Sequence, residues 1–412
     1  MLLVQKRELE RRLSEKYVAR DARLKGLESD LVKVILGPRR AGKSFFALHA
    51  LSGRKFGYAN FDDERLVGEK DYDKILEAIN SVYGNPTTLF FDEVQNLDKW
   101  ELFVNRLQRQ GYNLVVTGSN AHLLARELAT HLTGRHAPTI IFPFSFREYL
   151  SLEQKTLTEA EKTRKLREYA QNGGYPEPLL KNLDAKEYLS TLFQSTIYKD
   201  IVKRHKIRGP QALEDLAQYA ISNTATEYSY NTLAKATRCK SVHTAQKYAR
   251  FLEEAFLTFT MPRFSYKTSK QPEFNKKTYC IDNGLIAAIA QKNSPDWGKA
   301  FENLAAIELK RRELEGMEKA HYWKSQQGEE VDFALKKQAK ITALIQVCFD
   351  PSNPKTKQRE TRALIKASKE LSCKNLLILT DDFEATEHAT WQGQTAKIKY
   401  LPLAKWLSNP KT

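Results

Sequence analysis

The sequence is organised around residues 31–44, LVKVILGPRRAGKS. Its first part, from Leu31 to Leu36, is an apolar and β-branched run of the kind that forms a buried parallel strand. The run ends at Gly37, and the spacing G-x4-G-K-S then leads into the helical pattern FFALHAL. Such a loop lets backbone N–H groups approach phosphate oxygens, and the helix N-terminus adds partial positive charge. The stretch therefore predicts a nucleotide-binding loop.

The residues of this loop have distinct expected roles. Lys43 is placed to reach the β- and γ-phosphates of ATP, and the Ser44 hydroxyl is placed to ligate Mg²⁺. Phosphate contacts are expected along the whole loop, from Gly37, Pro38, Arg39, Arg40, Ala41, Gly42, Lys43, Ser44 and Phe45.

A second apolar run, in TTLFFDEVQN at residues 87–96, predicts another buried strand that ends in Asp92 and Glu93. Two adjacent carboxylates at the end of a buried strand are costly unless a cation satisfies them. Beside a phosphate-binding loop that cation is expected to be Mg²⁺, which makes Asp92 the second metal ligand. Glu93 is then placed to polarise the attacking water as a general base.

Two further residues are candidates for catalysis. Asn120 ends the strand pattern YNLVVTGSN at residues 112–120, where it either contacts the γ-phosphate or its water, or caps the next helix. Arg135 follows the helical pattern AHLLARELATHL and is a candidate to stabilise charge on the transferring phosphoryl group. It would act in its own subunit or in a neighbouring one, and an ordinary exposed arginine is the alternative.

Composition limits the class of protein. The 412 residues are 41% apolar and 28% charged, as in a globular protein, and no apolar run is long enough to span a membrane. The N-terminus, MLLVQKRELERRL, becomes charged too early for a secretory signal, and the four cysteines form no C-x-x-C pair. We therefore expect a cytoplasmic protein. The 66 basic and 50 acidic residues give a net charge of +16, which favours nucleic acid as a partner without requiring it.

A series of motifs in fixed order resembles a prokaryotic group of AAA-type ATPases that carry an uncharacterised C-terminal domain. The motifs are GPRRAGKS, YANFDDERL, LFFDEVQN, VVTGSN, LTGRH and FPFSFREYL, followed by GGYPE, IYKDIVKR, RFSY, YCIDNGL, FENLAAIEL and EVDF. The resemblance covers nearly the whole chain and implies an α/β fold with a parallel P-loop NTPase sheet of the additional-strand type. It also implies ATP binding and hydrolysis, with the catalytic glutamate beside the metal-binding aspartate, but no pathway.

The chain divides into five expected segments. They are an N-terminal helix in 1–28, the P-loop ATPase domain in 29–150, a helical lid or linker in 151–207, a winged helix-turn-helix in 208–275 and a restriction-endonuclease-like domain in 276–412. The winged helix is predicted from three helical patterns at 211–223, 231–237 and 241–255, followed by strand-turn-strand in AFLTFTMPRFSYKT at 255–268.

The third helix of the predicted winged helix has two different faces. Ser241 is its expected N-cap, and Val242, Ala245, Ala249 and Leu252 recur at helical spacing and should face the core. The opposite face carries the possible DNA-contacting residues His243, Thr244, Lys247 and Arg250. Such a face can enter the major groove of double-stranded DNA. Winged helices also dock proteins, and that alternative stays open.

The last segment resembles a restriction-endonuclease-like fold through Glu302 on a helix, Asp332 near a strand start and Gln346 on the next strand. In active members of that fold the acidic groups hold Mg²⁺, and a lysine two residues beyond the Glu or Gln activates water. Cys348 stands at the lysine position and offers no positive charge. We therefore expect a degenerate site without nuclease activity.

The sequence thus predicts an ATPase that is associated with DNA, in which nucleotide state controls the basic C-terminal half. The alternative is an ATP-gated switch or scaffold that docks a protein without DNA. A homo-oligomer or a protein partner is possible in either case. An active Mg²⁺-dependent nuclease is the third reading, and Cys348 argues against it.

Overall fold

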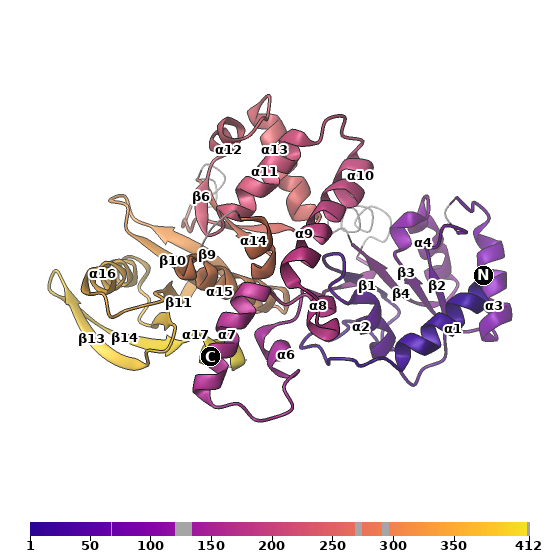
Figure 1. Cartoon of the computed structure of the whole chain (residues 1–412), viewed down its shortest axis with the longest axis horizontal. Coiled ribbons are helices and arrows are strands. Elements are labelled where there is room, and N and C mark those ends of the chain that lie inside the picture. Colours follow the sequence, from indigo (N-terminus) through magenta and orange to yellow (C-terminus); the bar gives the residue numbers. More distant parts are fainter. Residues whose placement is uncertain (67, 120–133, 268–273, 291–295, 410–412) are drawn as a thin grey trace. The chain divides into compact units, whose positions relative to one another are not determined.

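A computed structural model describes residues 1–66, 68–119, 134–267, 274–290 and 296–409 (Figure 1). The chain forms two compact units. The first unit comprises Met1–Pro143 together with Glu254–Phe256, and the second comprises Phe144–Glu253 and Leu257–Thr412. In the described part of the chain, helices fall short of the length and apolarity that crossing a bilayer requires.

The first unit is built on a five-stranded sheet in which every neighbouring pair is parallel. The strand order is β2-β3-β4-β1-β5, so β4 lies between β3 and β1. The strands are β1 (Val32–Leu36), β2 (Phe56–Asn60), β3 (Thr88–Asp92), β4 (Asn113–Gly118) and β5 (His136–Ile140). All five residues of β1 and of β3 are buried, as expected for the central region of a covered parallel sheet. The predicted parallel α/β core is confirmed.

Helices cover this sheet through apolar side chains. They are α1 (Leu2–Leu13), α2 (Lys43–Ala50), α3 (Tyr72–Tyr83), the short 3₁₀ turn η1 (Val94–Asn96) and α4 (Trp100–Arg109). Phe46 and Leu48 of α2 pack with Ile35, Phe90 and Val115 of the strands in one buried cluster. This packing fixes the start of α2 against the end of β1.

The N-terminal helix is shorter than the charged segment 1–28 in which we placed it. Helix α1 ends at Leu13, and the Ser14 hydroxyl donates to the carbonyl of Arg11. Leu2, Gln5 and Leu9 are buried. Gln5 donates from Nε2 to the carbonyl of Asn60 at 3.1 Å and accepts the Asn60 N–H at 2.9 Å, so α1 is bound to the end of β2.

The second unit begins with helices and a small antiparallel sheet of order β6-β8-β7. The helices are α6 (Phe146–Leu150), α7 (Glu159–Asn172), α8 (Pro176–Lys181), α9 (Ala185–Ser195), the π-helix η2 (Thr196–Val202), α10 (Lys203–His205), α11 (Gln211–Ser222), α12 (Tyr230–Ala236), α13 (Val242–Glu254) and α14 (Asn283–Ile289). The strands are β6 (Thr226–Tyr228), β7 (Thr258–Pro262) and β8 (Lys276–Cys280).

A six-stranded mixed sheet of order β13-β14-β12-β11-β10-β9 completes the unit. Its elements are α15 (Trp297–Leu314), β9 (Lys319–Lys324), β10 (Glu330–Lys337), β11 (Lys340–Val347), α16 (Pro354–Leu371), β12 (Leu376–Thr380), β13 (Ala385–Trp391), β14 (Gln394–Pro402) and α17 (Leu403–Ser408). Strand β12 is parallel to both β11 and β14, and the other pairs are antiparallel. Trp323, Leu344, Leu364 and Tyr400 lie in its core cluster.

Two local predictions for this unit were wrong. Val242 is 42% exposed, because it is the first residue of α13 and precedes the turn at which Ala245 becomes buried. The hairpin expected within residues 255–268 does not close there, since the strand that pairs with β7 is β8. The connection between β7 and β8 is longer than the turn that the strand-turn-strand pattern predicted.

A buried aspartate connects two glycine-containing turns of the second unit. Asp282 accepts the Gly174 N–H at 2.7 Å and the Gly284 N–H at 2.9 Å, and burial raises the pKa of its carboxyl to about 6. A Cβ added to Gly284 would lie 2.5 Å from the carbonyl oxygen of Asn172, so the turns approach too closely for a side chain there. The motifs GGYPE and YCIDNGL, distant in sequence, are therefore one structural junction.

We expect Asp282→Ala to destabilise the protein by roughly 2 to 4 kcal/mol, because two buried N–H groups lose their acceptor. The urea unfolding midpoint measures the effect. Asp71→Ala is the matched control, since Asp71 also accepts a backbone N–H but is exposed, and loss of such a cap costs about 1 kcal/mol. Equal losses in the two variants would contradict a structural role for the junction.

Candidate functional site

The loop after β1 has a backbone that only certain residues tolerate. Gly37 has φ +147°, and a Cβ there would lie 2.0 Å from the carbonyl oxygen of Ile141. Gly42, the N-cap of α2, has φ +90° in the left-handed region. The two glycines thus allow the chain to turn sharply from strand to helix, and the N–H groups at the start of α2 are directed at the loop. The loop geometry fits an anionic phosphate group.

Lys43 and Ser44, the first residues of α2, connect the loop to the end of β3. The Lys43 side chain is buried, and its ammonium donates to the carbonyl of Pro38 at 3.0 Å. It also lies 4.0 Å from Oε1 of Glu93. The Ser44 hydroxyl donates to Oδ1 of Asp92 at 2.8 Å. The structure therefore brings together the four residues for which we predicted phosphate, metal and water contacts.

Asp92 is held by hydroxyl groups from three elements. Besides Ser44, the hydroxyl of Thr117 in β4 donates to Oδ1, and the Tyr58 hydroxyl in β2 donates to Oδ2 at 3.3 Å. Burial raises the pKa of the Asp92 carboxyl, and the charge of Glu93 raises it further, against the opposing hydrogen bonds of Thr117 and Ser44. A buried carboxylate with a surplus of negative charge nearby is the donor type that suits a hard divalent cation.

Glu93 adopts the left-handed conformation, with φ 51° and ψ 46°. Its N–H donates to Thr117 Oγ1 at 2.9 Å, and Gln95 donates from Nε2 to its carboxylate at 2.5 Å. A non-glycine residue pays for this conformation in strain, so the contacts around it must hold it in place. Thr117 therefore orients both Asp92 and Glu93.

Two more residues were predicted to take part in catalysis, and the structure describes one of them. Asn120 lies outside the described residues. Arg135 is exposed and precedes β5, at the amino end of the sheet, whereas the phosphate-binding loop follows the carboxyl end of β1. The five residues of β1 separate the two by roughly 16 Å at the usual rise of a strand. Arg135 is thus remote from the loop of its own chain.

The predicted DNA-contacting face is mostly exposed. His243, Lys247 and Arg250 are exposed on α13, and Thr244 is half-buried. The Thr244 N–H donates to the Ser241 hydroxyl at 3.1 Å, which is the expected N-cap contact. Lys247 lies over the ring of Phe251 at 5.6 Å from its centroid.

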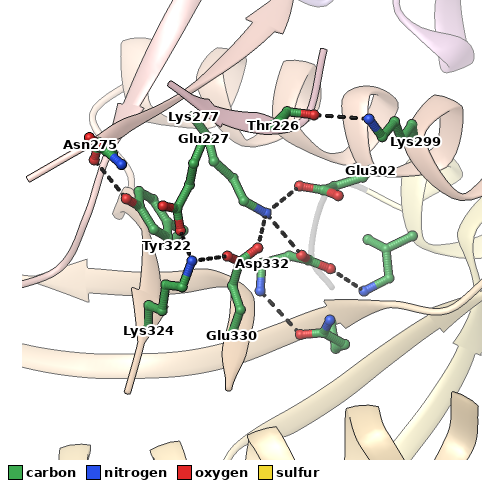
Figure 2. Close-up of polar contacts among 12 residues, drawn as sticks. Thr226, Glu227, Asn275, Lys277, Lys299, Glu302, Tyr322, Lys324, Glu330 and Asp332 are labelled. Carbon is green, nitrogen blue, oxygen red and sulfur yellow. Dashed lines mark hydrogen bonds and ion pairs between the residues drawn. The ribbon is translucent and has the colours of Figure 1, made fainter. Parts of the chain in front are cut away.

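Of the three residues predicted for a degenerate nuclease site, Glu302 of α15 and Asp332 of β10 lie near each other (Figure 2), and Gln346 comes from β11. The Asp332 N–H donates to Oε1 of Gln346 at 3.1 Å. Glu302 and Asp332 are linked through the ammonium of Lys277, which lies 2.9 Å from Oε1 of Glu302 and 3.2 Å from Oδ1 of Asp332. Burial raises the pKa of the Cys348 thiol to about 11, so this residue supplies no charge at neutral pH. Sequence reasoning missed Lys277 altogether.

Comparison with known proteins identifies the domain that contains the phosphate-binding loop. Residues 29–150 match the family model of an AAA domain, and residues 163–296 match a domain of unknown function. An uncharacterised protein of Methanocaldococcus jannaschii is 34% identical over an alignment of 416 positions, which covers 95% of this chain and 91% of that protein. The chain belongs to the family of this archaeal protein. Because residues 29–150 match the model of an AAA domain, they are called the AAA domain below.

Two further proteins are similar to this chain. An uncharacterised protein of Haemophilus influenzae is 29% identical over 322 residues, or 73% of this chain and 80% of that protein. The solved Walker-type ATPase of Pyrococcus abyssi is 16% identical and covers 69% of this chain and 95% of its own, with a TM-score of 0.43.

Arg20 makes a contact with the AAA domain that no sequence pattern predicts. Its guanidinium donates from Nη1 to the carbonyl of Ala41, in the phosphate-binding loop, at 2.9 Å, and from Nη2 to the carbonyl of Phe142. Arg20 stands in a segment rich in similar charged residues, so no local pattern marks it. It fixes the outer side of the loop to the chain that follows β5.

We expect Arg20→Met to weaken the binding of a fluorescent ATP analogue by roughly three- to ten-fold, because hydrogen bonds from a charged group are worth about 1.5 to 3 kcal/mol and part of that holds the loop. Titration of the analogue measures the change. Arg23→Met is the matched control, since Arg23 is exposed in the same segment. An unchanged affinity of Arg20→Met would show that the loop keeps its shape without this contact.

Proposed function

We propose that the protein binds ATP with Mg²⁺ at the AAA domain and hydrolyses it. The observation that carries this proposal is the convergence of Lys43, Ser44, Asp92 and Glu93 on one edge of the sheet. These side chains match the four tasks of phosphoryl transfer in P-loop enzymes: phosphate binding, metal binding from two sides, and positioning of the nucleophile.

Each residue has a defined task in this mechanism. Lys43 and the N–H groups of the loop from Gly37 to Phe45 bind the phosphates and place the γ-phosphoryl group. Ser44 and Asp92 would hold Mg²⁺, and the ion would supply positive charge for the phosphate oxygens. Glu93, oriented by the Thr117 hydroxyl, positions a water molecule and accepts its proton. Asn120 and Arg135 are proposed accessory residues, the latter acting on the loop of a neighbouring copy.

Glu93→Gln should leave ATP binding intact and reduce turnover by roughly 100-fold or more, because only the proton acceptor is lost. Binding of a fluorescent analogue and phosphate release measure the two effects separately. Lys43→Ala is the companion variant and should lose binding as well, since its ammonium is the phosphate contact. Normal phosphate release by Glu93→Gln would overturn the assignment of the base.

We further propose that the second unit contacts double-stranded DNA through a winged helix. The order α11, β6, α12, α13, β7, β8 with its small antiparallel sheet supports this proposal. The exposed basic residues Lys247 and Arg250 on α13 and the net charge of +16 add to it. The alternative is a protein partner docked on the same helix, with ATP controlling assembly.

The wild-type protein should bind duplex DNA tightly at low salt and weakly at moderate salt, because phosphate contacts release counterions. Replacing Lys247 and Arg250 with Glu should abolish this binding, since the variant loses two positive charges that face the phosphates. Fluorescence anisotropy at two salt concentrations measures it. Lys397→Glu with Lys399→Glu changes the net charge equally on exposed positions of β14 and serves as the control.

Two results would count against the DNA proposal. Equal loss of binding in both double variants would assign the effect to overall charge. ATP turnover of the wild-type protein that does not respond to duplex DNA at low salt would favour the protein-docking alternative.

A further inference from the structure

We propose that the ammonium of Lys277 is the resident cation of the nuclease-like site, where it occupies the carboxylate cradle and excludes a divalent metal. The carboxylate cradle is defined as Glu302, Glu330 and Asp332. The proposal does not depend on ATP hydrolysis or on DNA binding. It rests on the suggested likeness to nucleases only for the statement that a metal belongs there in active members of that fold.

The first observation is the position of the ammonium within the cradle. Nζ of Lys277 lies 2.9 Å from Glu302, 2.6 Å from Glu330 and 3.2 Å from Asp332, in each case measured to a carboxylate oxygen. Lys277 comes from β8, whereas the acids come from α15 and β10 (Figure 2). Its side chain is only 3% exposed. An ammonium has three N–H donors, and this cradle supplies an acceptor for each.

The second observation is that the potential metal ligands already have other partners. Oδ2 of Asp332 accepts the Val347 N–H at 2.9 Å, and Oε1 of Glu302 accepts the Tyr279 hydroxyl at 2.8 Å. The amide of Gln346 is engaged at both ends. Its oxygen accepts the Asp332 N–H, and its nitrogen donates to Glu360 at 2.6 Å.

These contacts test whether a metal fits, and it does not. Mg²⁺ requires oxygen ligands at about 2.0 to 2.1 Å in near-octahedral geometry. An ion bound to the same carboxylate oxygens would lie beside the Lys277 ammonium, and the two positive charges would repel each other strongly at this depth. Among the described residues no group of three His, Cys, Asp or Glu has metal-binding geometry. The cradle is therefore built around a lysine.

The charge balance explains why the lysine stays. Burial lowers the pKa of Lys277, but the carboxylates of Glu302, Asp332 and Glu330 raise it well above its ordinary value, so the amine remains protonated. One ammonium faces three carboxylates, and Glu330 has a second cationic neighbour in Lys324 at 3.8 Å. Burial, together with the charge of Asp332, raises the pKa of Glu302 to about 7. Removing Lys277 would leave an acidic cradle with an unmet need for positive charge.

The cradle also opens to solvent. A cleft of about 950 Å³ is lined by Lys277 and the cradle residues, with Gln346 and Arg359 at its side. A small hydrated ion can therefore reach the carboxylates. A metal ion is therefore excluded by the Lys277 ammonium and not by a lack of access from solvent.

The test is a calorimetric titration of the nucleotide-free full-length protein with MnCl₂. We expect Lys277→Met to bind one Mn²⁺ per chain more than the wild type, and Lys277→Met with Asp332→Asn to lose that site. Mn²⁺ should raise the thermal unfolding midpoint of Lys277→Met and leave that of the wild type unchanged. Lys324→Met is the matched control, because it removes a lysine near Glu330 without opening the cradle.

A second variant covers the case in which Lys277→Met does not fold. Lys277→Met with Glu330→Gln carries less uncompensated charge and should still gain the Mn²⁺ site through Glu302 and Asp332. Either of two results would overturn the proposal. One is a Mn²⁺ site in the wild type that Asp332→Asn removes, and the other is the absence of any gain in both Lys277 variants.

Discussion

The candidate nucleotide site of the AAA domain depends on the hydrogen bonds that the Asp92 carboxylate accepts. Oδ1 accepts hydroxyl hydrogens from Ser44 at the start of α2 and from Thr117 in β4. Because β4 lies between β3 and β1 in the sheet, this one oxygen connects the ends of three adjacent strands. Burying a carboxylate is costly, and the hydroxyl donors offset part of that cost. The same donors fix where a cation and a water molecule would be held.

Backbone strain around this carboxylate is maintained by specific neighbours. Glu93 is left-handed because its N–H is held by Thr117, and Gly37 lies so close to Ile141 that no other residue fits. Strain of this kind persists only where packing over-determines the conformation. The rigid, fully buried strands β1 and β3 supply that packing. The site is therefore positioned by the sheet rather than by the loops alone.

Local spacing made the loop and the Asp92-Glu93 pair predictable, because both are set by a few consecutive residues at the end of a strand. The parallel sheet followed from the same apolar runs. Contacts between distant residues were not predictable in this way. Arg20 binds carbonyls 21 and 122 positions away, and Lys277 meets an aspartate 55 positions along the chain. The pairing of β7 with β8 failed for the same reason, since alternation marks a strand but not its partner.

The negative charge of buried carboxylates is compensated differently in the two units. Each unit holds a buried carboxylate with a raised pKa, Asp92 at the end of β3 and Glu302 on α15. In the AAA domain the nearest lysine, Lys43, directs its ammonium to the carbonyl of Pro38 and stays 4.0 Å from Glu93. Asp92 thus accepts hydrogen bonds from hydroxyl groups and not from an ammonium.

In the second unit a lysine enters the carboxylate cluster itself and forms three ion pairs. A flexible lysine chain anchored on β8 places a permanent charge where an exchangeable ion would otherwise be needed. It also joins the small antiparallel sheet to α15 and β10 without a cofactor. Such an ammonium stabilises the cluster by neutralising the acids, but it cannot activate water as a metal ion does. Under the proposal made above, the uncharged thiol of Cys348 and the ammonium of Lys277 in the cradle both suit a structural centre rather than a catalytic one.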